Sequence, residues 1–271
     1  MKRMYRIAAV GIVLGLGTAG TVVGSIYINE SFTSPLASTG QTGIPTDWEL
    51  NWHQTPSNSD GDFAGIQAHA GNNYLRFRRG ASSPPSGVAL YYSPSEGVDS
   101  FQDFTAEMTV KYSGLGFSDF GVIIRASSKQ ARNNMGGYYV TISAHQFDDV
   151  PHLVLAHNVT DSNAANWTAL VSDEAAVSTN TDYRLRIEAY GPVINASLWD
   201  ATGTTQLSTV SYSDATEEDG YFGLRAAFGN NNRSYYFSDL TVIPEPGTAA
   251  LLLLAGGLLV GLRRTLRVHQ A

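Results

Sequence analysis

The chain has 271 residues, a formal net charge of −7 and no cysteine. Residues 30–243 hold 11 of the 17 Lys and Arg residues but 23 of the 24 Asp and Glu residues, so this part carries a net charge of −12. Such an acidic body repels nucleic acid and anionic lipid, and it disfavours polyanionic polysaccharide unless calcium bridges the charges. Without cysteine, no disulfide stabilises the fold.

Residues 1–24 have the pattern of a secretory signal peptide. The three cations Lys2, Arg3 and Arg6 precede an apolar run over residues 7–23, which ends in small residues. We expect signal peptidase to cleave before Ser25, and an uncleaved N-terminal anchor is the alternative. The pattern predicts that the protein is exported.

Residues 25–243 are predicted to form one all-β domain. Apolar and polar residues alternate in short segments separated by Gly, Asn, Asp and Pro turns, and we find neither a helical period nor an internal repeat. The strongest expected strands cover residues 104–112, 119–127, 138–145, 152–158, 183–189, 193–199, 221–228 and 235–243. The pattern predicts a two-sheet antiparallel β-sandwich of ten to thirteen strands, with Trp48, Trp52 and Trp199 in its core.

The C-terminal residues 244–271 form a separate segment in three parts. Pro244 and Pro246 lack a backbone N–H, so they end the last strand and form an extended spacer around Glu245. Residues 247–262 carry no charge and are almost wholly apolar, and Arg263 and Arg264 follow. A helix over this apolar run would reach about 24 Å, which is short for a hydrocarbon core of about 30 Å. A membrane helix this short suits a processing signal better than a permanent anchor, which is the alternative.

The Pro244-Glu245-Pro246 sequence, the apolar helix and the arginine cluster together resemble the PEP-CTERM sorting signal of Gram-negative bacteria. The resemblance implies that an exosortase in the membrane cleaves the tail and sends the protein to the cell surface or the extracellular matrix. The extension from Thr265 to Ala271 past the first arginines departs from the usual pattern.

The body is similar to concanavalin A-like jelly rolls of the laminin-G-like and glucanase-like branch. The resemblance rests on segments 30–32, 120–126, 137–140, 183–187, 220–225 and 236–242, together with Trp48. It implies two antiparallel sheets, one of them concave. Many such domains bind carbohydrate on the concave face or at its rim, and others are purely structural.

Saccharide binding is expected on the polar face of the central strands. Aromatic rings stack on the C–H faces of sugars, and a few convergent polar groups bond their hydroxyls. The candidate residues are Arg125, Tyr139, Thr141, His145 and Arg225, with Trp167 as a further exposed aromatic residue. The alternative is that Arg125 and Arg225 are ordinary charged residues on a solvent-exposed sheet face, where they only contribute to solubility.

The jelly-roll resemblance also implies a structural Ca²⁺ where the two ends of the domain meet. By position, the ligands would be Glu30 and Asp239, which supply the hard oxygen atoms that calcium prefers. The alternative is that Asp239 is an ordinary outward-facing residue. His145 and His157, with Asp148 and Asp149 between them, could hold a transition metal, although exposed hairpin histidines are the simpler interpretation.

The sequence predicts a non-enzymatic protein. A glycoside hydrolase needs two carboxylates that flank one bond, whereas Glu107 and Glu188 each stand alone on a strand, and Glu217 falls in a turn where we expect it to be solvated. There is no Gly-x-Ser-x-Gly elbow. We therefore expect a structural or polysaccharide-binding module, with a glycan hydrolase or a protein-binding adhesion module as the alternatives.

Overall fold

The computed structural model describes residues 28–32, 44–52, 63–69, 72–79, 86–93, 100–113, 119–129, 136–144, 147, 150–158, 167–213, 215–217, 219–228 and 233–244. The predicted signal peptide and the predicted membrane helix lie outside these residues, as do Glu245, Pro246, Arg263 and Arg264. These predictions therefore stay predictions. Within the described ranges, no helix is long and apolar enough to cross a membrane.

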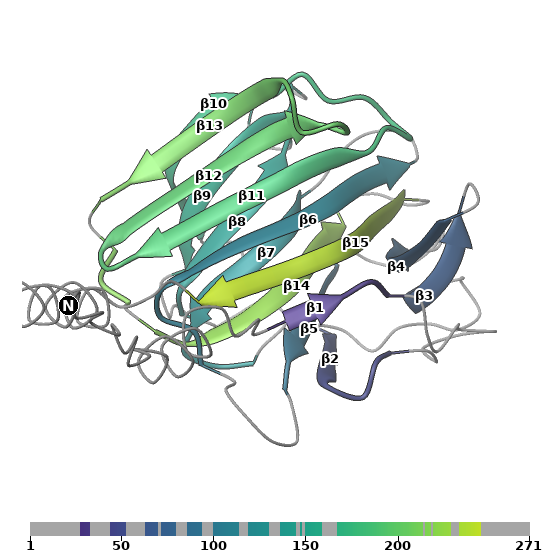
Figure 1. Ribbon diagram of the computed structural model, residues 1–271, viewed down its shortest axis with the longest axis horizontal. Coiled ribbons are helices and arrows are strands. Elements are labelled where there is room, and N and C mark those ends of the chain that lie inside the picture. The colour runs from purple at the N-terminus through teal and green to yellow at the C-terminus, as the bar shows by residue number, and fades with distance from the viewer. Residues whose placement is uncertain are drawn as a thin grey trace, which may run out of the picture.

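The described residues form two antiparallel sheets that pack face to face (Figure 1). The first sheet has eight strands. Its order is β13 (Gln206–Tyr212), β12 (Val193–Asp200), β11 (Tyr183–Tyr190), β6 (Phe104–Ser113), β15 (Arg233–Pro244), β4 (Asn72–Arg79) and β3 (Phe63–His69), and β1 (Ile28–Glu30) also pairs with β15. The second sheet has seven strands, in the order β10 (Trp167–Glu174), β9 (His152–Asn158), β8 (Tyr138–Ser143), β7 (Asp119–Ala126), β14 (Tyr221–Phe228), β5 (Ser86–Tyr92) and β2 (Trp48–Trp52).

Alternation along the strands decides which side chains enter the core. On β6, Phe104, Ala106 and Met108 are buried, whereas Thr105 and Glu107 between them are partly exposed. Successive side chains of a strand point to opposite faces, so this pattern requires one apolar and one polar face. The predicted all-β sandwich is confirmed.

Aromatic side chains from both sheets fill the space between them. Phe120 of β7 stacks on Tyr235 of β15 with ring centroids 4.8 Å apart, and Phe101, Phe104 and Phe222 form a second group at 5.8–6.1 Å. Each large apolar side chain buried in this way contributes about 1.5–3 kcal/mol. These contacts fix the two sheets relative to each other.

The first and last described strands lie side by side, as the jelly-roll resemblance implied (Figure 1). Strand β1 pairs with β15 so that Glu30 lies opposite Leu240. Strand β15 then continues to Pro244, which pairs with Phe104 and is its last residue. Proline cannot donate to a further ladder bond, which explains why the strand ends there.

The structure has fifteen strands in its described part, more than the ten to thirteen expected. The sequence pattern missed β3, because Ala64, Gly65 and Ala68 weaken both its alternation and its β-propensity. Trp48 is in the core as predicted, whereas Trp199 is only half-buried. Trp199 donates its indole N–H to Ser197 Oγ at 2.8 Å.

Candidate functional site

The outer face of the seven-stranded sheet, which points away from the sandwich core, is unusually well enclosed. A second apolar cluster lies on it, separate from the main core, and includes Tyr139, Val154 and Ala156. The partly buried Phe147 and Tyr221 pack against this cluster. A sheet face open to water would be polar and exposed, so this enclosed face differs from an ordinary solvated one.

Strand register brings two of the predicted saccharide-binding positions into one row across this face. Arg225 of β14 pairs with Gly121 of β7, and Gly121 pairs with Thr141 of β8. Tyr139 lies two residues before Thr141 and therefore on the same face. The predicted residues Tyr139, Thr141 and Arg225 thus come together although they are far apart in the sequence.

Four side-chain atoms on this face are buried without a hydrogen-bond partner. They are Tyr139 Oη, Thr141 Oγ1, His152 Nδ1 and Arg225 Nε. His152 belongs to the same face because it pairs with Ser143 of β8, two residues beyond Thr141. We find no other such buried side-chain atom in the described part of the chain. We call these four residues, together with Asp119, the outer-face cluster.

Arg225 is the most unusual member of the cluster. The residue is 5% exposed, and its guanidinium carbon lies 4.6 Å from the centroid of the Tyr139 ring. Within the described residues its guanidinium makes neither a hydrogen bond nor an ion pair. Burial raises the pKa of Tyr139, and the nearby Arg225 charge opposes that shift only in part. Because Arg225 covers its ring, Tyr139 offers a hydroxyl rather than an aromatic face, unlike the sequence expectation.

Asp119 supplies the acceptor of the cluster. The residue is 7% exposed, and its carboxylate accepts a hydrogen bond from Ser143 Oγ. Asp119 lies two residues before Gly121 on β7 and therefore shares its face, and it pairs with Ala227 of β14. The outer-face cluster thus combines hydroxyls, an imidazole, a guanidinium and a carboxylate.

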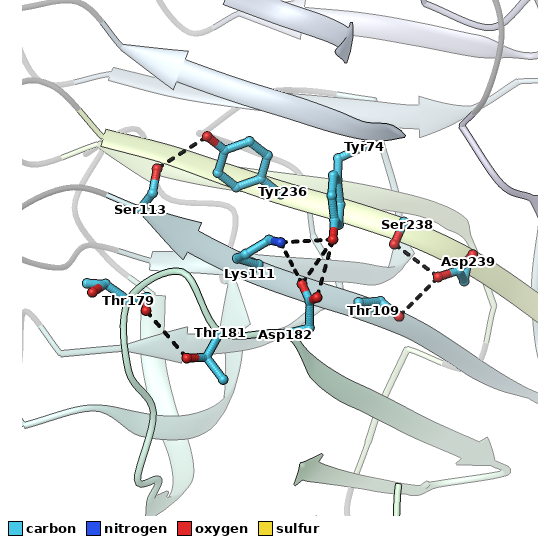
Figure 2. Close-up of polar contacts among 10 residues, drawn as sticks. All are labelled: Tyr74, Thr109, Lys111, Ser113, Thr179, Thr181, Asp182, Tyr236, Ser238 and Asp239. Atoms are coloured by element: carbon cyan, nitrogen blue, oxygen red, sulfur yellow. Dashed lines mark hydrogen bonds and ion pairs between the residues drawn. The ribbon is translucent and has the colours of Figure 1, made fainter. Parts of the chain in front are cut away.

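The outer face of the eight-stranded sheet provides the contrast (Figure 2). There Lys111 Nζ lies 2.9 Å from Asp182 Oδ1 and donates to Tyr74 Oη at 2.8 Å. The burial of Lys111 by itself would lower its pKa, but the bonds to Tyr74 and Asp182 raise it overall. Buried polar groups that are paired in this way are a normal part of a folded protein and need no ligand to explain them.

Arg125 does not occupy the outward position expected from the alternation of β7. It is completely buried, and its guanidinium donates to the carbonyl oxygens of Gln102 (2.9 Å), Gly191 (2.7 Å) and Glu217 (3.2 Å). Its φ is 53°, and the register between β7 and β14 shifts at this point. A β-bulge therefore redirects the side chain, and Arg125 joins loops at one end of the sandwich. Arg125 is therefore not part of the candidate site.

Two glycines next to the bulge explain why it is tolerated. A Cβ at Gly137 would lie 2.4 Å from Arg125 O, and one at Gly220 would lie 2.6 Å from Arg125 C. Both glycines have positive φ, 82° and 146°. The backbones of the two neighbouring chain segments can approach Arg125 only because these positions lack a side chain.

His157 and Glu217 form a pair at the same end of the sandwich, which corrects the expectation that Glu217 is simply solvated. The Nε2–H of His157 donates to Glu217 Oε1 at 2.8 Å, and the Glu217 side chain is only 30% exposed. His157 also stacks on Tyr138 at 4.9 Å. Burial acts to raise the pKa of Glu217, but hydrogen bonds from Tyr138, His157 and Thr216 bring it below its ordinary value. His145, Asp148 and Asp149 lie outside the described residues.

The remaining predicted positions are scattered. Glu30 Oε1 accepts from the backbone N–H of Phe32 at 2.8 Å, and exposed Asp239 accepts from Thr109 and Ser238 at 3.2 and 3.1 Å (Figure 2). The residues that the structure describes include no group of three or more His, Asp or Glu side chains suited to a metal ion. The Ca²⁺ site predicted at Glu30 and Asp239 stays a prediction. Trp167 begins β10, and its side chain is not described.

The isolated carboxylates lie on the other sheet. Glu107 pairs with Arg184 at 3.0 Å and Glu188 with Arg186 at 2.6 Å, all on the outer face of the eight-stranded sheet. Both carboxylate side chains are 44% exposed. Neither shares a face with the outer-face cluster.

No protein-family model matches the sequence, and no curated protein matches it. Solved structures do resemble the fold. A legume lectin-like domain from Entamoeba histolytica has a TM-score of 0.52 at 13% identity, covering 79% of this chain and 100% of that one. The VIP36 exoplasmic/lumenal domain in a Ca²⁺/Man3GlcNAc-bound form has a TM-score of 0.55 at 11% identity, covering 76% and 86%.

A third solved structure, the carbohydrate binding module CBM66 from Bacillus subtilis, has a TM-score of 0.47 at 17% identity, and the match covers 77% of this chain and 99% of that one. At identities this low, the likeness concerns the fold alone. Taken with the two antiparallel sheets, the comparisons show that the chain has the concanavalin A-like, legume-lectin-like jelly-roll fold.

Proposed function

We propose that the protein binds carbohydrate without catalysing a reaction, and that it does so at the outer-face cluster. One observation carries this proposal: the four buried polar side-chain atoms without a partner all lie on one face of one sheet. Leaving such an atom unpaired costs about 1–3 kcal/mol. Four such costs on one face are best explained by a ligand that pairs with these atoms.

The chemistry of the cluster matches sugar hydroxyls. A hydroxyl group donates one hydrogen bond and accepts others, so it can pair with Tyr139 and Thr141 in either direction. Asp119 can accept from a second hydroxyl, and Arg225 can donate. Small residues at Ala89 and Gly121 flank Arg225 in its row and leave that part of the face free of large side chains.

The fold agrees with this proposal. The VIP36 domain that it resembles is described as bound to Ca²⁺ and Man3GlcNAc, and VIP36 has also been solved in a metal-free form. These ligands belong to that protein. For this chain, the unpaired atoms support carbohydrate binding. Whether binding also requires calcium is tested by comparing binding in calcium with binding in EDTA.

The ligand must move side chains to reach the cluster, because Thr141 and Arg225 are only 2% and 5% exposed. Phe147 stacks on His152 at 4.0 Å, and Lys129 Nζ lies 4.6 Å from the centroid of the Tyr221 ring. Among the described residues, Phe147 and Tyr221 pack against the enclosed face, so both of these side chains would have to shift. Association slower than for an open surface site is the expected consequence.

The placement of carboxylates supports a binding role rather than hydrolysis. Glu107 and Glu188 are exposed, paired with arginines and remote from the cluster, and among the described residues Asp119 is the only carboxylate within it. Hydrolysis of a glycosidic bond needs two carboxyl groups about 5–9.5 Å apart around that bond. The protein-binding alternative gains little, because the described residues expose only three large apolar side chains, Val150, Tyr190 and Ile243, on separate elements.

We further propose that the protein is exported and that an exosortase processes its tail, so that the sandwich is displayed on the cell surface or in the extracellular matrix. The sequence features from Pro244 to Arg264 support this proposal. Mass spectrometry of the mature protein from cells with and without an exosortase would test it. An intact tail in both cells would contradict it.

A glycan array tests the binding proposal. We would apply the full-length chain, kept in a non-glycosidic detergent, in calcium and again in EDTA, and measure bound protein and released product. Thr141→Val and Tyr139→Phe each remove one unpaired hydroxyl and should abolish or strongly weaken binding without unfolding the protein. Tyr212→Phe, on the eight-stranded sheet, is the matched control. Absence of binding by the unaltered chain, or unchanged binding by both cluster variants, would refute the proposal.

A further inference from the structure

Arg225 differs from the other members of the outer-face cluster because it carries a permanent charge. A guanidinium stays protonated in proteins, so burial cannot neutralise it. The residue is 5% exposed, and the described residues offer its guanidinium the Tyr139 ring but no anionic partner. Buried charges in proteins are paired almost without exception. The buried charge of Arg225 therefore points to a bound anion as its missing partner.

The nearby charges do not supply that partner. Asp119 shares the face and lies one row away from Arg225, but its carboxylate is engaged with Ser143, and no ion pair joins it to Arg225. Arg125, the other buried arginine of this sheet, shows what a satisfied guanidinium looks like here. It donates to three carbonyl oxygens and lies 3.7 Å from Asp103.

We infer that the saccharide bound at the outer-face cluster carries an anionic substituent, a carboxylate or a sulfate or phosphate ester, that pairs with the Arg225 guanidinium. This inference rests on the proposed carbohydrate site and narrows its ligand class. The guanidinium presents a rigid fork of N–H donors that fits such oxyanions through two parallel hydrogen bonds. Tyr139 and Thr141, in the adjacent positions, donate to the same group or to a neighbouring hydroxyl.

The overall charge of the body does not contradict this inference. A net charge of −12 over residues 30–243 repels a long polyanion along its length. A single anionic group that enters an enclosed site next to Arg225 is attracted at short range, where the interaction is strongest and screening by salt is weak. We therefore expect recognition of one anionic sugar unit rather than of a continuous polyanionic chain.

The test compares ligands that share one trisaccharide backbone and differ in whether they carry anionic groups. Trigalacturonic acid, its carboxyl-reduced neutral counterpart and a sulfate ester of that counterpart are titrated into the full-length chain, alongside an array of neutral and acidic glycans. The chain should bind at least one anionic form about tenfold more tightly than its neutral counterpart. Arg225→Gln, which removes the charge but keeps an N–H donor, should reduce that affinity about 10- to 100-fold and reduce the affinity for neutral glycans much less.

Two further variants separate charge from fold. Arg225→Lys keeps the charge but loses the fork, so it should retain only part of the preference for the anionic ligand. Arg184→Gln, which removes an exposed arginine from the other sheet, should change nothing. If only neutral glycans bind, the inference is overturned while the proposed function stands. If no glycan of any kind binds, both are overturned, and unaltered binding of the anionic ligand by Arg225→Gln overturns the inference alone.

Discussion

Arg125 is predicted to be a principal stabilising residue of the sandwich, and Arg125→Met tests this. The change removes every hydrogen bond of a completely buried guanidinium and leaves the carbonyl oxygens of Gln102, Gly191 and Glu217 without that donor. Breaking a buried charged network typically costs about 3–5 kcal/mol. Methionine retains a Cβ, so any backbone strain at a φ of 53° stays the same and the difference reports the guanidinium.

Urea unfolding followed by tryptophan fluorescence measures the effect. The free energy of unfolding should fall by about 3–5 kcal/mol, and for a domain of this size each kcal/mol lowers Tm by roughly 2–4 °C. Arg225→Met is the matched comparison, because that arginine is also buried but makes no hydrogen bond among the described residues. It should keep or raise the stability. A loss below about 1 kcal/mol for Arg125→Met, or equal losses for both variants, would refute the reasoning.

Three further changes test the packing and the polar pairs. Gly121→Ala places a Cβ 2.1 Å from Val140 O, so β7 and β8 must separate, and urea unfolding should show a loss of about 2 kcal/mol or more. This loss should exceed that of Gly191→Ala, whose Cβ meets no atom within 4 Å and adds only the backbone strain of a φ of 49°. Lys111→Met leaves Asp182 and Tyr74 without their cation and should lower Tm. An unchanged Tm would mean that the Lys111–Asp182 ion pair does not contribute to stability. Glu217→Gln should lower the urea midpoint at pH 7. Because the pKa of Glu217 is lowered in the folded protein, its contribution is fully present above the ordinary glutamate pKa of about 4.3. The contribution disappears as pH falls through the lowered pKa, so the two midpoints should converge in acid.

The alternation of apolar and polar residues predicted most of the strands, because a half-buried strand must repeat every two residues. Strands β6 and β11 follow this rule along nearly their whole length. Strand β3 was missed because a Gly- and Ala-rich segment carries little of that signal. The meeting of the first and last strands followed from the jelly-roll resemblance rather than from any local pattern.

The position of Arg125 could not be read from alternation, because a β-bulge breaks the period of two where it occurs. A signal was present nevertheless. Gly137 and Gly220, which precede the two strands that flank β7, have positive φ and make room for the bulge. Gly137 and Gly220, at the starts of the two neighbouring strands, are the sequence feature that could have indicated that the alternation of β7 ends before residue 125.

The candidate site was predicted in part. Tyr139, Thr141 and Arg225 were chosen as polar residues on central strands, and the register brings them onto one face. The missing hydrogen-bond partners could not be foreseen, because pairing depends on which side chains meet across strands. His152 and Asp119 were not predicted as site residues, because their place in the cluster also depends on the register between strands. The partners of Glu217 also come from distant segments, so the sequence suggested a solvated carboxylate.

Photo-crosslinking tests the central claim most directly, because it reports where a glycan binds as well as whether it binds. A diazirine-bearing derivative of the best array ligand is bound to the full-length chain, irradiated and located by peptide mass spectrometry. We predict label on peptides of β7, β8 and β14 that contain Asp119, Tyr139, Thr141 or Arg225, and loss of this label in Thr141→Val. Label confined to the eight-stranded sheet, or unchanged in that variant, would contradict the account.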